Sequence, residues 1–125
     1  MKYEMTTEEI YQAVANIEYI TQDDFGVEYC EKSSSYIRTM KAKGYYLPSE
    51  VLVCVANKLI EKMTTLNGLA HRKRHLIEEL IERLALIISE RQMAKQHKVL
   101  REMIIDIVDR INAEKDYGVA PMVVL

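Results

Sequence analysis

The stretch TQDDFGVEYCEKSSSYIRTMKAKG, residues 21–44, decides the fold that we expect for this chain. Thr21 precedes two acidic residues, a pattern typical of a helix start, so we predict a short helix over about 22–29. After a short break, three consecutive serines can each cap a second helix over about 34–43. Gly44 ends that helix at the position where glycine is favoured. The stretch therefore predicts two short helices joined by a tight turn.

Two further helices flank this stretch. Thr6 and Glu9 fit a capping box, and apolar residues at helical spacing predict a helix over about 7–19. Ser49 follows a proline and caps a helix over about 50–63. Helices this short are not stable alone, so all four must share one core. The expected core residues are Ile10, Val14, Ile17, Phe25, Tyr29, Ile37, Met40, Leu52, Val55 and Leu59.

The second half of the chain has a different character. A linker is expected over 64–68, and residues 69–116 then contain no Gly or Pro. Their apolar residues form a helical stripe that stops near residue 89 and resumes out of phase near residue 99. We favour a hairpin of two helices, about 69–92 and 97–116, with one long helix as the alternative.

Composition limits the class of protein. Hydrophobic residues make up 49% and charged residues 29%, and only four Gly and two Pro are present. These values favour a helical globular protein. Cys30 and Cys54 lie on apolar stretches and are expected to be buried thiols in a reducing compartment. The first residues are polar, and no apolar run approaches the ~20 residues of a membrane span, so we expect a cytoplasmic protein without membrane contact.

The net charge of −2 does not favour nucleic acid, but positive charge is clustered along the chain. Residues 32–49 carry four basic residues and no acid. The expected outward face of the second short helix is small, polar and basic: Ser34, Ser35, Arg38, Thr39, Ala42 and Lys43, with Lys32 before it and Lys41 at its edge. Such a face suits a DNA major groove, where Arg binds guanine with two bonds, hydroxyls contact base edges and Lys holds phosphates.

Taken together, several positions resemble the Cro/CI-like (XRE-type) helix-turn-helix repressors. The matching residues are Thr21, Gln22, Phe25, Ser33, Ser35, Tyr36, Ile37, Pro48, Ser49, Ala56 and Leu59. The resemblance covers residues 7–62 and implies an all-α fold with an N-terminal four-helix helix-turn-helix domain over residues 1–63. It also implies that base edges are contacted by Ser33, Ser34, Ser35 and Arg38, with Thr39 as a further candidate. Gln22 is implied to bind phosphate.

We therefore expect a sequence-specific transcriptional regulator, in particular a repressor, that binds double-stranded DNA as a homodimer on a pseudo-palindromic site. The expected dimerisation region is 69–116, with contacts through Leu76–Ile88 and Leu100–Ile111, followed by an apolar tail over 117–125. A helical protein-interaction module, such as an antitoxin or accessory adaptor, is the alternative, and a structural oligomer is a third class.

Signals for catalysis are missing from the sequence. There is no phosphate-cradling glycine loop and no nucleophile elbow. His71 and His75 lie four residues apart, but two ligands are too few for a metal site. We expect no enzymatic activity, cofactor or metal.

Overall fold

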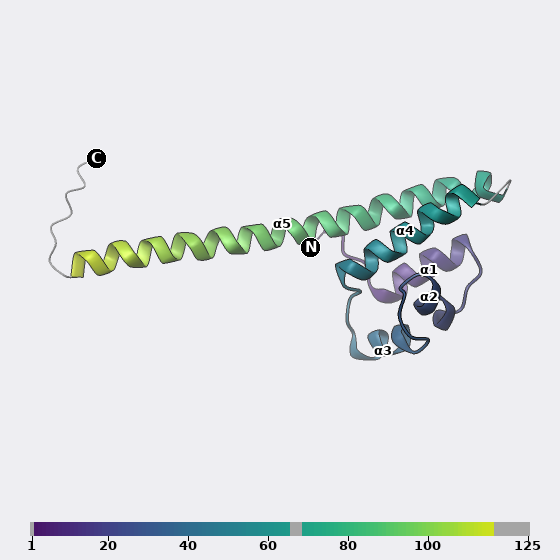
Figure 1. Cartoon of the computed structure of the whole chain (residues 1–125), viewed down its shortest axis with the longest axis horizontal. Helices are drawn as coiled ribbons and strands as arrows, with labels where there is room; N and C mark the ends of the chain where they lie inside the picture. The colour runs from purple at the N-terminus through teal and green to yellow at the C-terminus, as the bar shows by residue number, and fades with distance from the viewer. Residues whose placement is uncertain (1, 66–68, 117–125) are drawn as a thin grey trace. The chain divides into compact units, whose positions relative to one another are not determined.

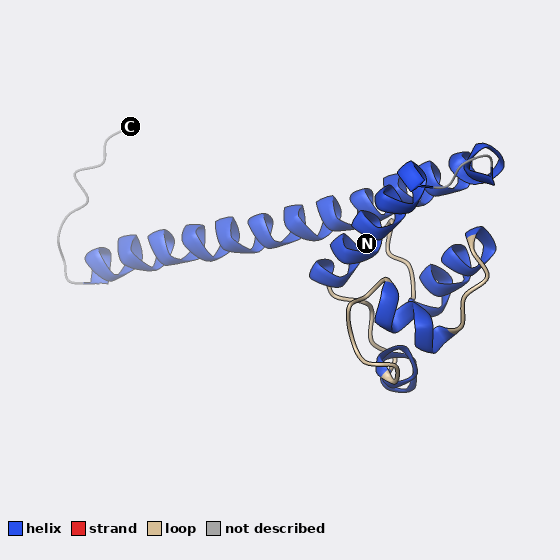
Figure 2. Ribbon diagram, turned by 45° about the vertical axis from the view of Figure 1, so that its right-hand side comes forward, coloured by secondary structure: helices blue, strands red, loops and turns tan. Residues whose placement is uncertain are grey.

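The computed structural model describes residues 2–65 and 69–116, and every regular element in these ranges is a helix (Figures 1 and 2). The helices are α1 (Thr7–Ile17), α2 (Gln22–Glu28), α3 (Tyr36–Lys43), α4 (Ser49–Thr65) and α5 (Leu69–Asp116). The predicted all-α class is confirmed. Most of the expected linker, residues 66–68, and the whole apolar tail, 117–125, lie outside the described residues.

The capping signals place the first helices. In α1, the Thr6 hydroxyl accepts from the Glu9 amide and the Glu9 carboxylate accepts from the Thr6 amide, each at 3.1 Å. In α2, the Thr21 hydroxyl accepts from the Asp24 amide at 3.2 Å. Gly44 ends α3 with a left-handed φ of 66°, which costs glycine little.

Helix α3 begins two residues later than the serine run predicts. Ser35 is its N-cap residue, but φ −90° and ψ −4° are close to helical values and its side chain makes no capping bond. An N-cap hydroxyl reaches the following amides from an extended backbone, which Ser35 lacks. The Ser35 hydroxyl instead lies 3.3 Å from the Ser33 hydroxyl.

The predicted core forms, and Phe25 lies within it. All ten expected core residues are buried except Met40, which is half-buried. The Phe25 ring packs between Tyr11 and Tyr29, with centroid distances of 5.7 and 5.6 Å. The core also contains residues that periodicity did not select, among them Met5, Ile20 and Leu47.

Residues 69–116 form one helix, α5, so the favoured hairpin is wrong and the alternative holds. The buried side chains of its first part are Ile77, Leu80, Leu84 and Ile87, and they belong to the same core as α1–α4. The phase shift of the apolar stripe does not require a chain break, because two parts of one helix can present different faces to different surroundings.

Polar contacts also tie α5 to the first helices. The amides of Lys2 and Tyr3 donate to the Glu90 carboxylate at 2.8 and 3.1 Å, and the Lys73 ammonium donates to the Ile17 carbonyl at the end of α1. The chain divides into two compact units, of which the first ends at Glu90. This unit extends beyond residue 63, the expected end of the first domain. Part of the Leu76–Ile88 half of the expected dimer surface is therefore buried in the chain's own core.

Candidate nucleic-acid interface

The turn between α2 and α3 is built on close backbone approach. The Lys32 amide donates to the Gly26 carbonyl at 2.9 Å, and a Cβ on Gly26 would lie 3.0 Å from the Ser33 carbonyl oxygen. Glu31 bends the chain with a φ of 55°, a left-handed conformation that costs a residue with a side chain about 1–2 kcal/mol. Glycine at position 26 therefore allows α3 to start directly against α2.

Helix α3 buries one side and exposes the other. Ile37 is fully buried, and Tyr36 and Met40 are half-buried against the core. The outward residues are Ser33, Ser34, Ser35, Arg38, Thr39 and Lys43, all of them exposed. These residues, with Lys32, Lys41 and Gln22, are called the α3 face below.

Hydroxyl groups at the start of the α3 face are close to one another. The Thr39 hydroxyl donates to the Ser35 carbonyl at 3.0 Å, and the hydroxyls of Ser33 and Ser35 lie 3.3 Å apart. A hydroxyl can donate or accept when its hydrogen rotates, so exposed serines can adapt to either kind of base edge.

Two cations of the α3 face have acidic partners on other helices. The Arg38 Nε lies 3.2 Å from the Asp23 carboxylate of α2, with 63% and 48% of the two side chains exposed. The Lys41 ammonium lies 2.6 Å from Glu8 of α1. Hydrogen bonds from Gln12 and from Lys41 hold the pKa of Glu8 below its usual value.

Gln22 is the first residue of α2 and is half-buried. It shares a surface hollow with Asp23 and Arg38, which Asn16 and Tyr19 also line. The structure thus brings Gln22 and Arg38 to one place, although the sequence placed them in separate helices.

The remaining two lysines lie against aromatic rings. The Lys32 ammonium is 5.9 Å from the centroid of the Tyr36 ring, and the Lys43 ammonium is 5.8 Å from that of Tyr45. Exposed contacts of this kind are worth only about 0.5–1 kcal/mol, so they leave both lysines able to turn toward a phosphate.

Sequence reasoning missed the acidic partners Asp23 and Glu8. Asp23 was taken as a favourable charge at the start of a helix, and Glu8 belongs to the first turn of α1. Nothing in local spacing predicts either pair, because each joins residues that only the packing of separate helices brings together.

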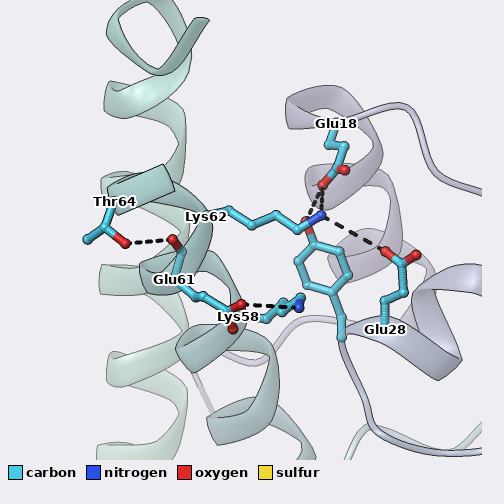
Figure 3. Close-up of polar contacts among 7 residues, drawn as sticks. Glu18, Glu28, Lys58, Glu61, Lys62 and Thr64 are labelled. Carbon is cyan, nitrogen blue, oxygen red and sulfur yellow. Dashed lines mark hydrogen bonds and ion pairs between the residues drawn. The ribbon is translucent and has the colours of Figure 1, made fainter. Parts of the chain in front are cut away.

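Behind the interface, an ionic cluster joins α1, α2 and α4 (Figure 3). The Lys62 ammonium lies 2.5 Å from Glu18 and 3.9 Å from Glu28, and the Tyr29 hydroxyl donates to Glu18 at 2.6 Å. Burial and the neighbouring Glu18 carboxylate raise the pKa of Tyr29 well above its usual value, so the phenol stays protonated as a donor. These contacts hold the ends of α1 and α2 against α4.

Neither cysteine is poised for thiolate chemistry. Burial raises the pKa of Cys30 to about 12. Cys54 is half-buried rather than buried, because its thiol reaches the Glu31 carboxylate at 3.4 Å at the edge of the core. Partial desolvation and this carboxylate raise the pKa of Cys54 as well. Both groups are therefore thiols at neutral pH.

Among the side chains that the structure describes, no three His, Cys, Asp or Glu residues are grouped as a metal site. His71 lies outside the residues whose side chains are described. None of the described helices combines the length and the apolar character that crossing a bilayer requires.

A family of unknown function, DUF6626, matches residues 7–106. The chain belongs to this family. The matched residues include α1–α4 and continue along α5 beyond Glu90, so the DUF6626 sequence pattern is not confined to the four helices that carry the α3 face. No curated protein and no solved structure was found to match the chain.

Proposed function

We propose that this member of DUF6626 is a sequence-specific DNA-binding regulator whose α3 face enters the major groove. One observation carries the proposal: the residues from Ser33 to Lys43 that point away from the buried Ile37 are all small, polar or basic, and exposed. A groove about 12 Å wide admits a helix with such a face.

The ion pair between Arg38 and Asp23 is compatible with base recognition. Both side chains are about half exposed or more, and an exposed pair contributes about 0–1 kcal/mol. A bidentate contact between Arg and guanine discriminates by about 1–3 kcal/mol. Exchanging Asp23 for a guanine edge is therefore favourable, and Asp23 orients the guanidinium until DNA arrives.

A single α3 covers only a few base pairs, so the proposal includes a homodimer on a pseudo-palindromic site. Two copies related by a two-fold axis read half-sites about 34–36 Å apart. Occupying such a site next to a promoter excludes other proteins, which makes repression the expected mode. The short, Gly26-dependent connection between α2 and α3 supports the helix-turn-helix part of the proposal.

The direct test selects bound duplexes from a random library with the full-length chain, and then compares two variants on the selected site. Arg38→Ala should cost about 1–3 kcal/mol and relax the preference at one base position. Lys43→Ala should weaken binding to all sequences and lower the slope of log K against log salt by about 0.9. Lys95→Ala in α5 is the matched control and should change neither quantity.

If selection yields no sequence preference, or if both variants of the α3 face change only the salt slope, the base-reading assignment is wrong. The second candidate function is then favoured. That function is a helical protein-interaction module, such as an antitoxin or adaptor, and it rests on the exposed apolar side chains of α5 after Arg91. A gel shift against mixed genomic fragments at ~150 mM salt separates the two, since an adaptor would retard no selected band.

A further inference from the structure

The second part of α5 carries an exposed apolar row with a coiled-coil period. Its members recur at alternating intervals of four and three residues: Met93, His97, Leu100, Ile104, Ile107 and Ile111. Between 49% and 64% of each apolar member is exposed. We call this row the α5 seam. An apolar row of this length, interrupted only by His97, on a water-facing helix marks a surface that another helix covers.

We propose that a second copy of this chain covers the α5 seam, as a parallel, in-register, two-stranded coiled coil over residues 93–111. This coiled coil would form the homodimer that the proposed function requires, and to that extent the inference rests on the proposed function. The seam is distinct from the buried stripe of the same helix. The buried residues Ile77, Leu80, Leu84 and Ile87 continue in register to 91, 94, 98 and 101, and none of these positions is in the seam.

The layers nearest His97 favour two strands. In heptad notation, His97, Ile104 and Ile111 occupy the a positions, and Met93, Leu100 and Ile107 occupy the d positions. Ile104 at a with Leu100 at d is the two-stranded pattern, whereas Ile107 at d between Ile104 and Ile111 is the pattern of larger bundles. A polar residue at a single a position, here His97, fixes both the register and the number of strands. The His97 layer is satisfied only when the two copies of His97 meet.

Residues beside the seam favour the parallel direction. Parallel helices bring a g residue next to the following e residue of the second copy, which places Gln96 beside Arg101 and Met103 beside Val108. The antiparallel arrangement that keeps the whole seam paired instead places Arg101 of one copy next to Arg101 of the other. Like charges in contact disfavour that arrangement.

The test is sedimentation equilibrium of the full-length chain without DNA. The expected species is a dimer. His97→Leu should tighten this dimer, because a polar residue at an a position costs stability. Ile104→Asn should give a monomer with unchanged helix content by circular dichroism, whereas Ile105→Asn, on the outer side of the same helix, should remain dimeric. A monomeric or tetrameric wild-type chain would overturn the proposal.

Direction is tested by oxidation of single-cysteine substitutions. Ile104→Cys should form a covalent dimer, because equivalent a positions meet in the parallel arrangement, and Ile105→Cys should not. Crosslinking only in mixtures of Leu100→Cys with Ile104→Cys would show antiparallel helices and overturn the parallel assignment.

Binding to single half-sites distinguishes this inference from the proposed function. If Ile104→Asn still binds an isolated half-site but loses the palindrome, both stand. A wild-type dimer that binds no DNA would refute the proposed function but not the coiled coil. A wild-type monomer that binds a half-site would refute the coiled coil but not the proposed function.

Discussion

At the scale of single residues, Glu31 shows how the turn between α2 and α3 is held. Among the described residues, Glu31 is the one non-glycine residue with a positive φ. Its carboxylate accepts a weak hydrogen bond from the Cys54 thiol. The left-handed backbone is therefore retained by the surrounding packing, while the side chain gains little in return.

We predict that Glu31→Gly raises the free energy of unfolding by about 0.5–1 kcal/mol. Glycine removes the left-handed penalty of about 1–2 kcal/mol, and the larger entropy of its unfolded chain offsets part of the gain. Urea unfolding followed by circular dichroism measures the change. Ser34→Gly, at an exposed neighbour without a positive φ, is the control and should be slightly destabilising. Equal losses in both variants would contradict the prediction.

Lys62 of α4 stabilises the charged form of the Glu18 carboxylate, which lies where α1, α2 and α4 meet. Partial burial raises the pKa of Glu18, but hydrogen bonds from Lys62 and Tyr29 outweigh it, so the net pKa is lowered. A lowered folded-state pKa means that the carboxylate stabilises the fold above its ordinary pKa. This contribution is lost as the pH falls through the folded-state pKa.

Lys62→Met is therefore expected to lower stability by about 1 kcal/mol at pH 7, since a charged hydrogen bond is lost and Glu18 remains partly buried. The difference from wild type should shrink as the pH falls through the lowered folded-state pKa of Glu18, because Glu18 is then protonated in both proteins. Thermal melts from pH 7 to 3 test this. Lys58→Met removes a pair with the exposed Glu61 at 3.6 Å, and Lys58 contributes less than Lys62 to the lowered pKa of Glu18, so this variant should change stability by less than about 0.5 kcal/mol. A constant difference across the range would reject the role of Glu18.

At the scale of elements, α2 contributes a charge that competes with DNA for Arg38 of α3 in the proposed complex. Asp23→Asn removes the negative charge that pairs with Arg38 of the α3 face, while keeping the side-chain shape. We expect it to tighten binding to the selected duplex by about 0.5–1 kcal/mol, two- to fivefold. Fluorescence anisotropy at ~100 mM salt measures the change. Asp109→Asn makes the same charge change on exposed α5 and should have no comparable effect. Weaker binding by Asp23→Asn would indicate that Asp23 positions Arg38 in the complex as well.

Helix α5 is an element with two roles, and its first part completes the core of α1–α4. Leu84 is fully buried there, whereas Leu86 on the same helix is 38% exposed. Leu84→Ala should destabilise the first unit by about 2–5 kcal/mol, as cavities in packed cores do, while Leu86→Ala should cost under about 1 kcal/mol. Chemical unfolding of both variants gives the comparison. Similar small losses would mean that α5 does not belong to this core.

At the scale of the whole molecule, the two compact units divide the proposed work. The first unit, ending at Glu90, carries the α3 face, and the second carries the α5 seam. A variant of the seam should therefore alter cooperativity on a palindrome, and a variant of the α3 face should alter sequence preference. This separation follows from the placement of the two surfaces on different units, and it lets each proposal fail independently.

The sequence by itself determined the helices of the first unit and most of its core. Capping and glycine signals act between neighbours in the chain, as Thr6 with Glu9 and Gly44 show, so they can be recognised without the fold. Periodicity likewise identified Phe25 and Leu59 as inward residues, because a helix places every third or fourth side chain on one face.

Only the tertiary structure decided which apolar faces the chain's own core buries and which charges meet. Periodicity shows that a face is apolar but not whether the chain's own core or another surface buries it, and for that reason α5 was divided wrongly at its change of phase. The partner of Arg38 was also hidden, since Asp23 reaches it through the packing of α2 against α3 and not through any spacing along one helix. Contacts between separate elements depend on how helices are placed in space, and local sequence patterns do not encode that placement.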